Sequence, residues 1–269
     1  MVSPCDSNGV DQRTLAIIQP FMHFQSKLGA DRVRVIDGII FDPTVIEPIN
    51  PQIFELKYWN FRGAIQVMGG RGSVLFINDG SRQWVLRHYR RGGLIGKVIA
   101  DRYVWAGAER TRAFREWRLL AQLYAQGLPV PQPVAARYQR SGLTYQAGLI
   151  TVAIPQAQTL TQRLQTEALS ESTWQHLGEV LARFHAAGVQ HADLNAHNIL
   201  FSLDQTITVL DFDRGQLRTV QRAWIEAVLQ RLLRSLNKLK QQRNIHFNEG
   251  DWAVLHSAHD HKLQSLLQR

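Results

Sequence analysis

One segment, residues 191–213, constrains the fold of this chain more than any other, because it combines polar side chains with two short apolar runs. The runs, residues 199–202 and 206–210, are separated by three residues, which predicts an antiparallel hairpin. Asn198 directly precedes the first run and Asp211 directly follows the second. The pairing therefore predicts that Asn198 and Asp211 face each other at the open end of the hairpin.

Asp193 enters the same end from the loop before the hairpin, so two carboxylates and an amide carbonyl are expected to converge there. Such a set of oxygen ligands suits Mg²⁺. Asp and Asn in loops more often form turns, and Asp204, in the middle of the hairpin loop, is predicted to do so. The residue types, their order and the flanking apolar runs favour a metal site for Asp193, Asn198 and Asp211.

The rest of the chain predicts strands first and helices later. Apolar runs between residues 35 and 89 are typical of strands, and Asp79-Gly80 between two of them indicates a hairpin turn. Later elements are a helix over 110–126 with Phe114, Trp117, Ala121 and Tyr124 on one face, an extended connector over 128–133, a short buried strand over 148–153, a helix from the N-cap Ser170 to Ala187, and a basic amphipathic helix over 220–243.

We therefore expect an α+β fold with two lobes. Residues 1–34 would form an N-terminal extension. Residues 35–154 would form an N-terminal lobe, built from an antiparallel sheet and one main helix, and residues 155–269 a smaller, mostly helical C-terminal lobe. The connector near residues 151–158 would divide the lobes.

The composition fits such a protein. With 269 residues, 45% hydrophobic and 20% charged, the chain is neither collagen-like, wholly disordered nor a disulfide scaffold. Its single cysteine, Cys5, excludes an intrachain disulfide and a cysteine-rich zinc cluster. No apolar stretch is long enough to span a bilayer, and the first residues lack the features of a secretion signal. We expect the protein to stay in the cytoplasm.

Positive charge is concentrated in two blocks. The formal net charge is +9, residues 82–118 hold ten basic and three acidic residues, and residues 214–243 hold eight basic and one acidic. This pattern suggests an anionic partner, such as phosphate groups, nucleic acid or a membrane surface. The alternative is two solvated helix faces.

The segment 191–213 resembles the catalytic loop and metal-binding Asp of the protein-kinase-like phosphotransferases. The resemblance implies that Asp193 accepts the proton of the acceptor hydroxyl and that Asn198 and Asp211 hold Mg²⁺ on the phosphates of ATP. One departure is Asp213, which stands where the usual motif has Gly.

Upstream residues follow the same pattern. Gly69-Gly70-Arg71-Gly72-Ser73-Val74 looks like the Gly-rich loop that covers the phosphates, although Gly in a hairpin is commonplace. Glu116 resembles the helix Glu that orients the phosphate-binding Lys, the alternative being a surface Glu paired with a nearby Arg. The strand Lys itself is missing, and Arg87 and Lys97 are the candidates to replace it.

The acceptor is expected to be compact, because only 58 residues follow Asp211 and no Ala-Pro-Glu motif is present. Several strings are similar to the lipopolysaccharide core kinases, above all those acting on 3-deoxy-D-manno-octulosonic acid (Kdo): Leu86-Arg87-His88-Tyr89-Arg90-Arg91-Gly92-Gly93-Leu94, Asp101-Arg102-Tyr103, Arg110-Thr111-Arg112, Leu128-Pro129-Val130-Pro131-Gln132-Pro133 and His191-Ala192-Asp193-Leu194-Asn195-Ala196-His197-Asn198.

This resemblance implies ATP-dependent phosphorylation of the 4-hydroxyl of Kdo on lipid A precursor, an anionic glycolipid. It also implies a peripheral location on the cytoplasmic side of the bacterial inner membrane, with no nucleic-acid partner. From their clustering we expect Arg90, Arg91, Arg102, Arg110 and Arg112 to bind the acceptor.

Alternatives remain at this point. A heptose kinase of the same pathway would share the chemistry, and a choline- or aminoglycoside-type kinase would need an acidic acceptor pocket. A pseudokinase or membrane-binding module would explain the missing Lys, and a nucleic-acid binder would explain only the charge. His256, His259 and His261 could form a metal site, but a solvated tail is the favoured interpretation. His191 is expected to stabilise the loop rather than act as a base.

Overall fold

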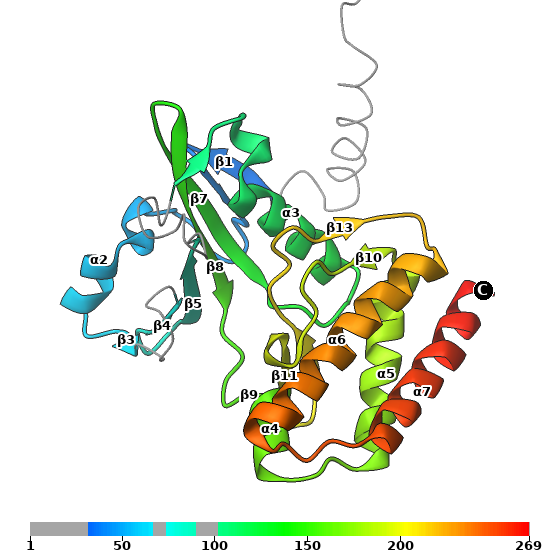
Figure 1. Cartoon of the computed structure of the whole chain (residues 1–269). Helices are drawn as coiled ribbons and strands as arrows, with labels where there is room; N and C mark the ends of the chain where they lie inside the picture. Colours follow the sequence, from blue (N-terminus) through cyan, green and yellow to red (C-terminus); the bar gives the residue numbers. More distant parts are fainter. Residues whose placement is uncertain (1–31, 67–73, 90–101, 269) are drawn as a thin grey trace, which may run out of the picture.

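The computed structural model describes residues 32–66, 74–89 and 102–268. It has the expected two-lobed α+β architecture, with a sheet-rich N-terminal lobe and a helical C-terminal lobe (Figure 1). The last long strand of the first lobe ends at Val152, and the next strand, in the second lobe, begins at Gln158. Only the few residues between them join the lobes at this point.

The N-terminal lobe is built on an antiparallel sheet. In the described part of the chain its order is β1-β2-β7-β8-β5-β4-β3, with β6 pairing with β8. The strands are β1 (Arg34–Ile36), β2 (Ile39–Phe41), β3 (Ile65–Gln66), β4 (Val74–Asn78), β5 (Gln83–His88), β6 (Tyr103–Val104), β7 (Pro133–Ser141) and β8 (Thr144–Val152). The short helices η2 (Pro51–Phe54) and α2 (Leu56–Phe61) lie between β2 and β3, and η4 (Ala108–Arg110) follows β6.

The hairpin predicted at Asp79-Gly80 is confirmed, because β4 and β5 pair antiparallel across this turn. The Asp79 carboxylate accepts hydrogen bonds from the backbone N–H groups of Ser81 and Arg82, 3.1 and 2.8 Å long. This local bonding is how Asp stabilises turns, and it fixes the position of β5, which carries Arg87.

Helix α3 (Arg112–Ala125) is the main helix of this lobe, as predicted, and packs against β7 (Figure 1). Phe114, Trp117 and Ala121 are buried, whereas Tyr124 is 42% exposed and does not belong to the buried face. The helix is followed by Gly127 at φ 70°, a left-handed conformation that favours Gly.

The hairpin of β7 and β8 is longer than the sequence predicted, since only an extended connector over 128–133 and a strand over 148–153 were expected. The two strands pair from Pro133 to Ser141 and from Thr144 to Val152, joined through Gly142 at φ 59°. The outer part of β7 is exposed and polar, so its residues lack the apolar alternation that reveals a strand.

The C-terminal lobe contains α4 (Leu160–Thr166), α5 (Glu171–Ala186), α6 (Arg222–Arg243) and α7 (Glu249–Leu267), with η5 (Ala196–Asn198) and the short strands β9 (Gln158–Thr159), β10 (Val189–Gln190), β11 (Ile199–Phe201), β12 (Ile207–Val209) and β13 (Gln216–Leu217). The predicted start of α5 is confirmed, because the Ser170 side chain accepts a hydrogen bond from Thr173 N–H. Trp224 is buried, so the apolar face of α6 belongs to the core of the lobe.

The expectation of a solvated tail near the C-terminus is wrong. Residues 249–267 form α7, which packs along α5. Asn248 caps it in a capping box with Asp251, and Leu255 and His259 are fully buried. Of the three histidines assigned to a tail, His259 is buried in the contact with α5, whereas His261 is exposed.

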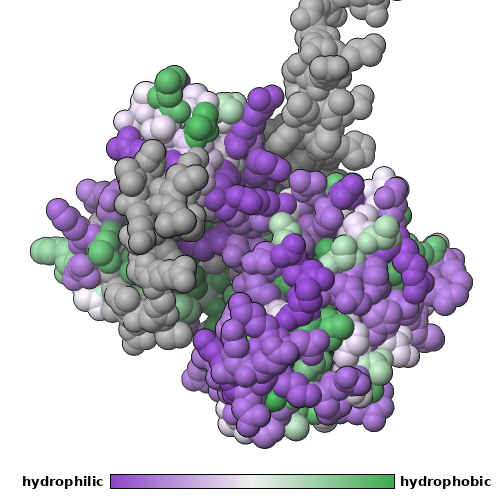
Figure 2. Space-filling view, viewed as in Figure 1, coloured by the Kyte–Doolittle hydropathy of each residue, from purple (hydrophilic) through white to green (hydrophobic). Residues whose placement is uncertain are grey.

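In the described ranges no helix is long and apolar enough to cross a membrane. The face shown in Figure 2 is mostly hydrophilic over the C-terminal lobe.

Candidate active site

A cavity of about 910 Å³ lies between the lobes. Its lining is largely apolar and comes from β4 and β5, the connection after β8, α4 and the hairpin of β11 and β12: Val74, Phe76, Val85, Val152, Ala153, Ile154, Pro155, Ala157, Leu200 and Leu210 are among these residues. An apolar cavity of this size with a few polar groups at its edge is the usual form of a small-molecule site.

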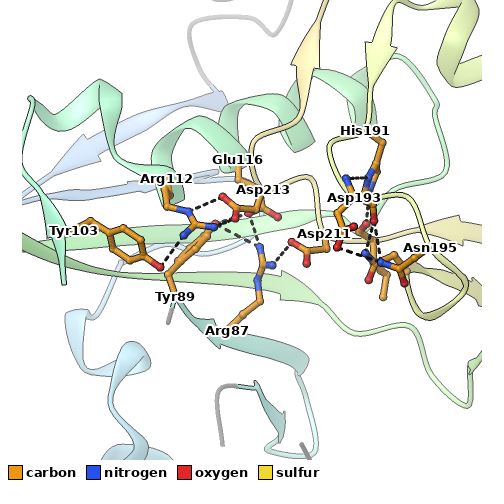
Figure 3. A network of polar contacts seen from close by, with 12 residues as sticks. Arg87, Tyr89, Tyr103, Arg112, Glu116, His191, Asp193, Asn195, Asp211 and Asp213 are labelled. Carbon is orange, nitrogen blue, oxygen red and sulfur yellow. Dashed lines mark hydrogen bonds and ion pairs between the residues drawn. The ribbon is translucent and has the colours of Figure 1, made fainter. Parts of the chain in front are cut away.

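The cluster around Arg87 adjoins this cavity, because Arg87 follows Val85 on β5 and Asp211 follows Leu210. The guanidinium of Arg87 donates from one terminal nitrogen to Glu116 on α3 and from the other to Asp211 (Figure 3). A carboxylate from each lobe is therefore held by one side chain. A planar guanidinium can bind two carboxylates in this way, whereas the single ammonium of Lys could not reproduce both contacts with the same geometry.

Glu116 is buried, with 2% of its side chain exposed, so the alternative of a surface Glu is wrong. It also accepts a 2.5 Å hydrogen bond from the hydroxyl of Tyr89. Burial raises the pKa of Glu116, and the charge of Arg87 opposes that effect. Burial and the charge of Glu116 raise the pKa of Tyr89 well above its ordinary value, which keeps Tyr89 a hydrogen-bond donor.

His191 holds the loop that carries Asp193. Its Nε2–H donates to the carbonyl oxygen of Leu210 over 2.8 Å, and its Nδ1 accepts from the Asp193 N–H over 3.1 Å. Burial lowers the pKa of His191, which is consistent with a neutral ring that uses both nitrogens structurally. The prediction that His191 stabilises the loop is confirmed.

The Asp193 carboxylate is open to solvent, with 64% of its side chain exposed. Asn195 donates to Asp193 Oδ2 at 3.3 Å, and Arg231 of α6 approaches Asp193 Oδ1 at 3.4 Å. These contacts orient the carboxylate but leave it accessible to a ligand.

The predicted register of the hairpin is wrong by one residue. Ile199 pairs with Val209, and the Leu210 N–H donates to Asn198 O over 2.8 Å. Asn198 is therefore opposite Leu210, and Asp211 lies one position further. The three-residue loop over 203–205 pairs Ser202 with Thr206, and counting back four positions from this pair places Asn198 opposite Leu210. Gln205 closes the loop at φ 65°, and Asp204 accepts hydrogen bonds from Ser202 and Thr206 as the predicted turn former.

Asn198 and Asp211 nevertheless lie at the same end of the hairpin. The Nδ2 group of Asn198 donates to the carbonyl oxygen of Asp193 over 3.0 Å, which leaves the amide oxygen for a cation. Asp211 adopts the left-handed conformation at φ 60°, which turns its carboxylate toward Arg87. The available oxygens are of the kind that Mg²⁺ prefers, so these residues fit such an ion.

Of the expected acceptor-binding residues, Arg112 has another role. Its Nε donates to Asp213 over 2.8 Å, a second nitrogen also pairs with Asp213, and Nη1 donates to Tyr103 over 2.7 Å (Figure 3). Arg102 and Arg110 are exposed on the N-terminal lobe. The remaining residues of the expected sites lie outside the described residues: Gly70, Arg71, Gly72, Ser73, Arg90, Arg91 and Lys97.

Sequence reasoning missed Tyr89 and Arg231. Tyr89 stands two positions after Arg87, directly after the end of β5, and in extended chain this spacing places both side chains on one face. Arg231 lies in the second basic block, but nothing in the sequence indicates that α6 runs beside residues 193–196. The α6 contact also includes Ser235, whose hydroxyl accepts from Ala196 N–H at 3.3 Å. The histidines near the C-terminus form no metal cluster among the residues that the structure describes.

The fold and this site define a protein-kinase-like phosphotransferase. A helix Glu is joined to a strand cation, an Asp-Phe-Asp sequence follows the hairpin, and a loop Asp stands open beside them. More specifically, the chain belongs to the lipopolysaccharide kinase (Kdo/WaaP) family, whose model matches residues 58–259.

Individual relatives agree with this assignment. The chain is 42% identical over 227 residues to a 3-deoxy-D-manno-octulosonic acid kinase of Stenotrophomonas maltophilia (strain K279a), covering 84% of this chain and 91% of the relative. It is 42% identical over 221 residues to the kinase of that name from Vibrio parahaemolyticus, covering 82% and 92%. It is 41% identical over 227 residues to that from Xanthomonas axonopodis pv. citri, covering 84% and 91%.

Proposed function

We propose that this protein transfers the γ-phosphoryl group of ATP to the 4-hydroxyl of Kdo attached to lipid A precursor. The observation that carries the proposal is the bridge from Glu116 through Arg87 to Asp211, beside the accessible Asp193 carboxylate. Relatives named Kdo kinases at 42% identity support the choice of sugar. They favour a kinase over the non-catalytic and nucleic-acid-binding alternatives.

In the proposed mechanism the cavity between the lobes holds the nucleotide, with its apolar lining around the base. Arg87, oriented by Glu116, binds the phosphate chain. Asp193 positions the acceptor hydroxyl and takes its proton as the oxygen attacks the γ-phosphorus in line with the departing ADP. Most of the rate enhancement comes from alignment and from charge stabilisation in the cleft.

Asn198 and Asp211 would hold Mg²⁺ when nucleotide is bound. The ion would offset negative charge on the phosphate oxygens. The residues fit this role through the Asn198 amide oxygen and the Asp211 carboxylate.

We also propose that the protein works at the cytoplasmic face of the inner membrane as a peripheral protein. The two basic blocks support this, since each Lys or Arg near an anionic bilayer contributes about 1 kcal/mol to binding. Binding to anionic vesicles that weakens with added salt is the expected behaviour, and equal binding to neutral vesicles would contradict it.

The function is tested with labelled ATP and a panel of Kdo-bearing and heptose-bearing lipid acceptors. We expect label on Kdo acceptors, and replacing Asp193 by Asn is expected to lower kcat by about 10²–10⁴-fold. A thermal shift with Mg-ATP should persist in the Asp193→Asn variant, because Asp193 contacts the proposed metal ligand Asn198 through its backbone carbonyl oxygen, which the substitution keeps. Full activity in the Asp193→Asn variant would refute the proposed mechanism. Label on the heptose-bearing acceptors alone would show that the acceptor sugar is heptose and not Kdo.

A further inference from the structure

Arg231 is a cation that touches the proposed base. It lies on α6 and approaches Asp193 Oδ1 at 3.4 Å, while one turn later Ser235 accepts a hydrogen bond from Ala196 N–H at 3.3 Å. These two contacts, at positions four apart, fix this face of α6 against the loop over residues 193–196. The guanidinium is therefore held next to the position where the acceptor hydroxyl must lie.

The contact between Arg231 and Asp193 is loose and does not saturate either side chain. It is a single 3.4 Å approach between groups that are 48% and 64% exposed. The Arg118 and Glu109 pair, in contrast, has two 2.7 Å hydrogen bonds. Arg has five N–H donors, and the contact with Asp193 uses one of them, so Arg231 has further donors for a ligand that binds beside Asp193. An exposed ion pair of this kind contributes little to stability.

Among the described residues, two other arginines close to the reacting groups, Arg87 and Arg112, are bound to carboxylates. Arg87 pairs with Glu116 and Asp211, and Arg112 pairs with Asp213. An acceptor that carries an acid group would bring a second negative charge next to Asp193. Such an acceptor requires a partly free cation on the acceptor side of the loop, and Arg231 meets that requirement.

We propose that Arg231 binds an anionic oxygen group of the acceptor while Asp193 takes the proton of its hydroxyl. This inference rests on the proposed function and names the feature by which the site selects acid sugars over neutral sugars. The carboxylate of the sugar is one source of such oxygens, and a phosphate of the lipid is the other.

The first test compares acceptor kinetics and acceptor binding in variants of the full-length protein. Replacing Arg231 by Gln should raise the acceptor KM about 10–100-fold, the usual effect of losing a charge-assisted hydrogen bond, with the KM for ATP unchanged. Arg231→Lys should recover part of the loss because it keeps the charge. Arg234→Gln, which removes an exposed cation from the same helix, is the matched control and should change the acceptor KM less than about twofold.

The second test identifies the anionic group with altered acceptors. If the carboxylate of the sugar is the partner of Arg231, its conversion to a carboxamide should weaken acceptor binding to the wild-type protein as much as Arg231→Gln weakens binding of the unaltered acceptor. The two losses should not add when the altered acceptor is tested on the variant. If a phosphate is the partner, a dephosphorylated acceptor should show this behaviour instead. Additive losses with both acceptors, or a lower kcat with unchanged acceptor KM and affinity in Arg231→Gln, would show that Arg231 only orients Asp193 and would overturn the inference.

Binding measured by calorimetry separates this inference from the proposed function. Acceptor affinity that depends on Arg231 without phosphoryl transfer would refute the proposed function alone. Acceptor affinity that is equal in the wild-type protein and Arg231→Gln, or no binding of any acidic acceptor by the wild-type protein, would refute the inference.

Discussion

At the residue scale, the most informative side chain is Arg87, because it pairs with a carboxylate from each lobe. Replacing Arg87 by Met should lower kcat/KM for ATP by about 10²-fold or more, as expected for losing a charged phosphate ligand. It should also lower the free energy of unfolding by about 3–5 kcal/mol, because Glu116 is left as an unpaired buried charge. Steady-state kinetics and urea unfolding measure the two effects.

The control for Arg87 is the double variant Arg87→Met with Glu116→Leu. It should regain much of the stability but none of the activity, since an apolar residue removes the unpaired charge without supplying a phosphate ligand. Equal instability of the single and double variants would mean that Glu116 is not the cause.

The buried His185 predicts a pH dependence of stability. It contacts His259 over 2.8 Å between α5 and α7, and burial lowers its pKa from 6.5 to about 3, with the nearby His259 and His191 adding to the shift. Below pH 6.5 the unfolded chain therefore takes up a proton that the folded protein does not. Stability is complete above this pH and falls as the pH decreases toward 3.

Between pH 7.5 and 5.5, His185 alone should lower the free energy of unfolding by about 1.4 kcal/mol. Urea unfolding at the two pH values measures this change. In His185→Gln the free energy of unfolding should decrease by that amount less than in the wild-type protein. The control is His176→Gln, at an exposed position of the same helix, and its decrease should match that of the wild-type protein. An unchanged decrease in His185→Gln would refute the assignment.

At the element scale, the packing of α7 on α5 depends on Gly178. A Cβ at this position would lie 2.3 Å from the carbonyl oxygen of Leu255 and 3.0 Å from the backbone N of His259. Gly in the middle of a helix normally costs about 0.5–1 kcal/mol relative to Ala, so Gly178 is explained by this close approach of the two backbones.

Gly178→Ala should therefore lower the free energy of unfolding by about 1–3 kcal/mol, as overpacking does, although Ala is the better helix former. Glu179→Ala, at the exposed neighbouring position, should be neutral or slightly stabilising. A more stable Gly178→Ala protein in thermal or urea unfolding would mean that the helices pack less closely than the structure shows.

Elements were predictable where they follow a simple pattern. Ser170 at the start of α5 and the Asp79 turn gave correct boundaries, because caps and turns depend on neighbouring residues alone. Helix α7 was not predicted, because the burial of its apolar side chains depends on partners distant in the chain. The outer part of β7 was not predicted, because its exposed polar residues lack the apolar alternation of a strand. The predicted register of β11 and β12 was wrong by one residue, because the three-residue loop pairs Ser202 with Thr206 and so places Asn198 opposite Leu210 rather than Asp211.

At the scale of the whole molecule, two arginines link the lobes near the site. Arg87 reaches Asp211, and Arg112 at the start of α3 binds Asp213 with side chains that are 23% and 16% exposed. Asp213 stands where the usual protein-kinase motif has Gly, and its pairing with Arg112 gives this carboxylate a structural role. The pair holds α3, and with it Glu116, at a set distance from the segment that carries Asp211.

Arg112→Gln and Asp213→Asn should each lower kcat/KM for ATP about tenfold, and the double variant should be no worse than either single one. A coupling of about 0.5–3 kcal/mol is usual for groups in direct contact. The control is Glu109→Gln, which breaks an ion pair with Arg118 inside the N-terminal lobe and should leave the kinetics unchanged. Additive effects in the double-variant cycle would show that Arg112 and Asp213 act independently.

The sequence by itself determined the kind of chemistry and the two-lobed order of elements, because Asp193, Asn198 and Asp211 stand in a short local pattern framed by apolar strands. The tertiary structure decided the pairing of Arg87 with Glu116 and Asp211, the burial of Glu116, and the approach of Arg231 to Asp193. These features join residues 29 to 124 positions apart. Contacts at such separations depend on how the sheet and helices pack, and no local pattern of residues specifies them.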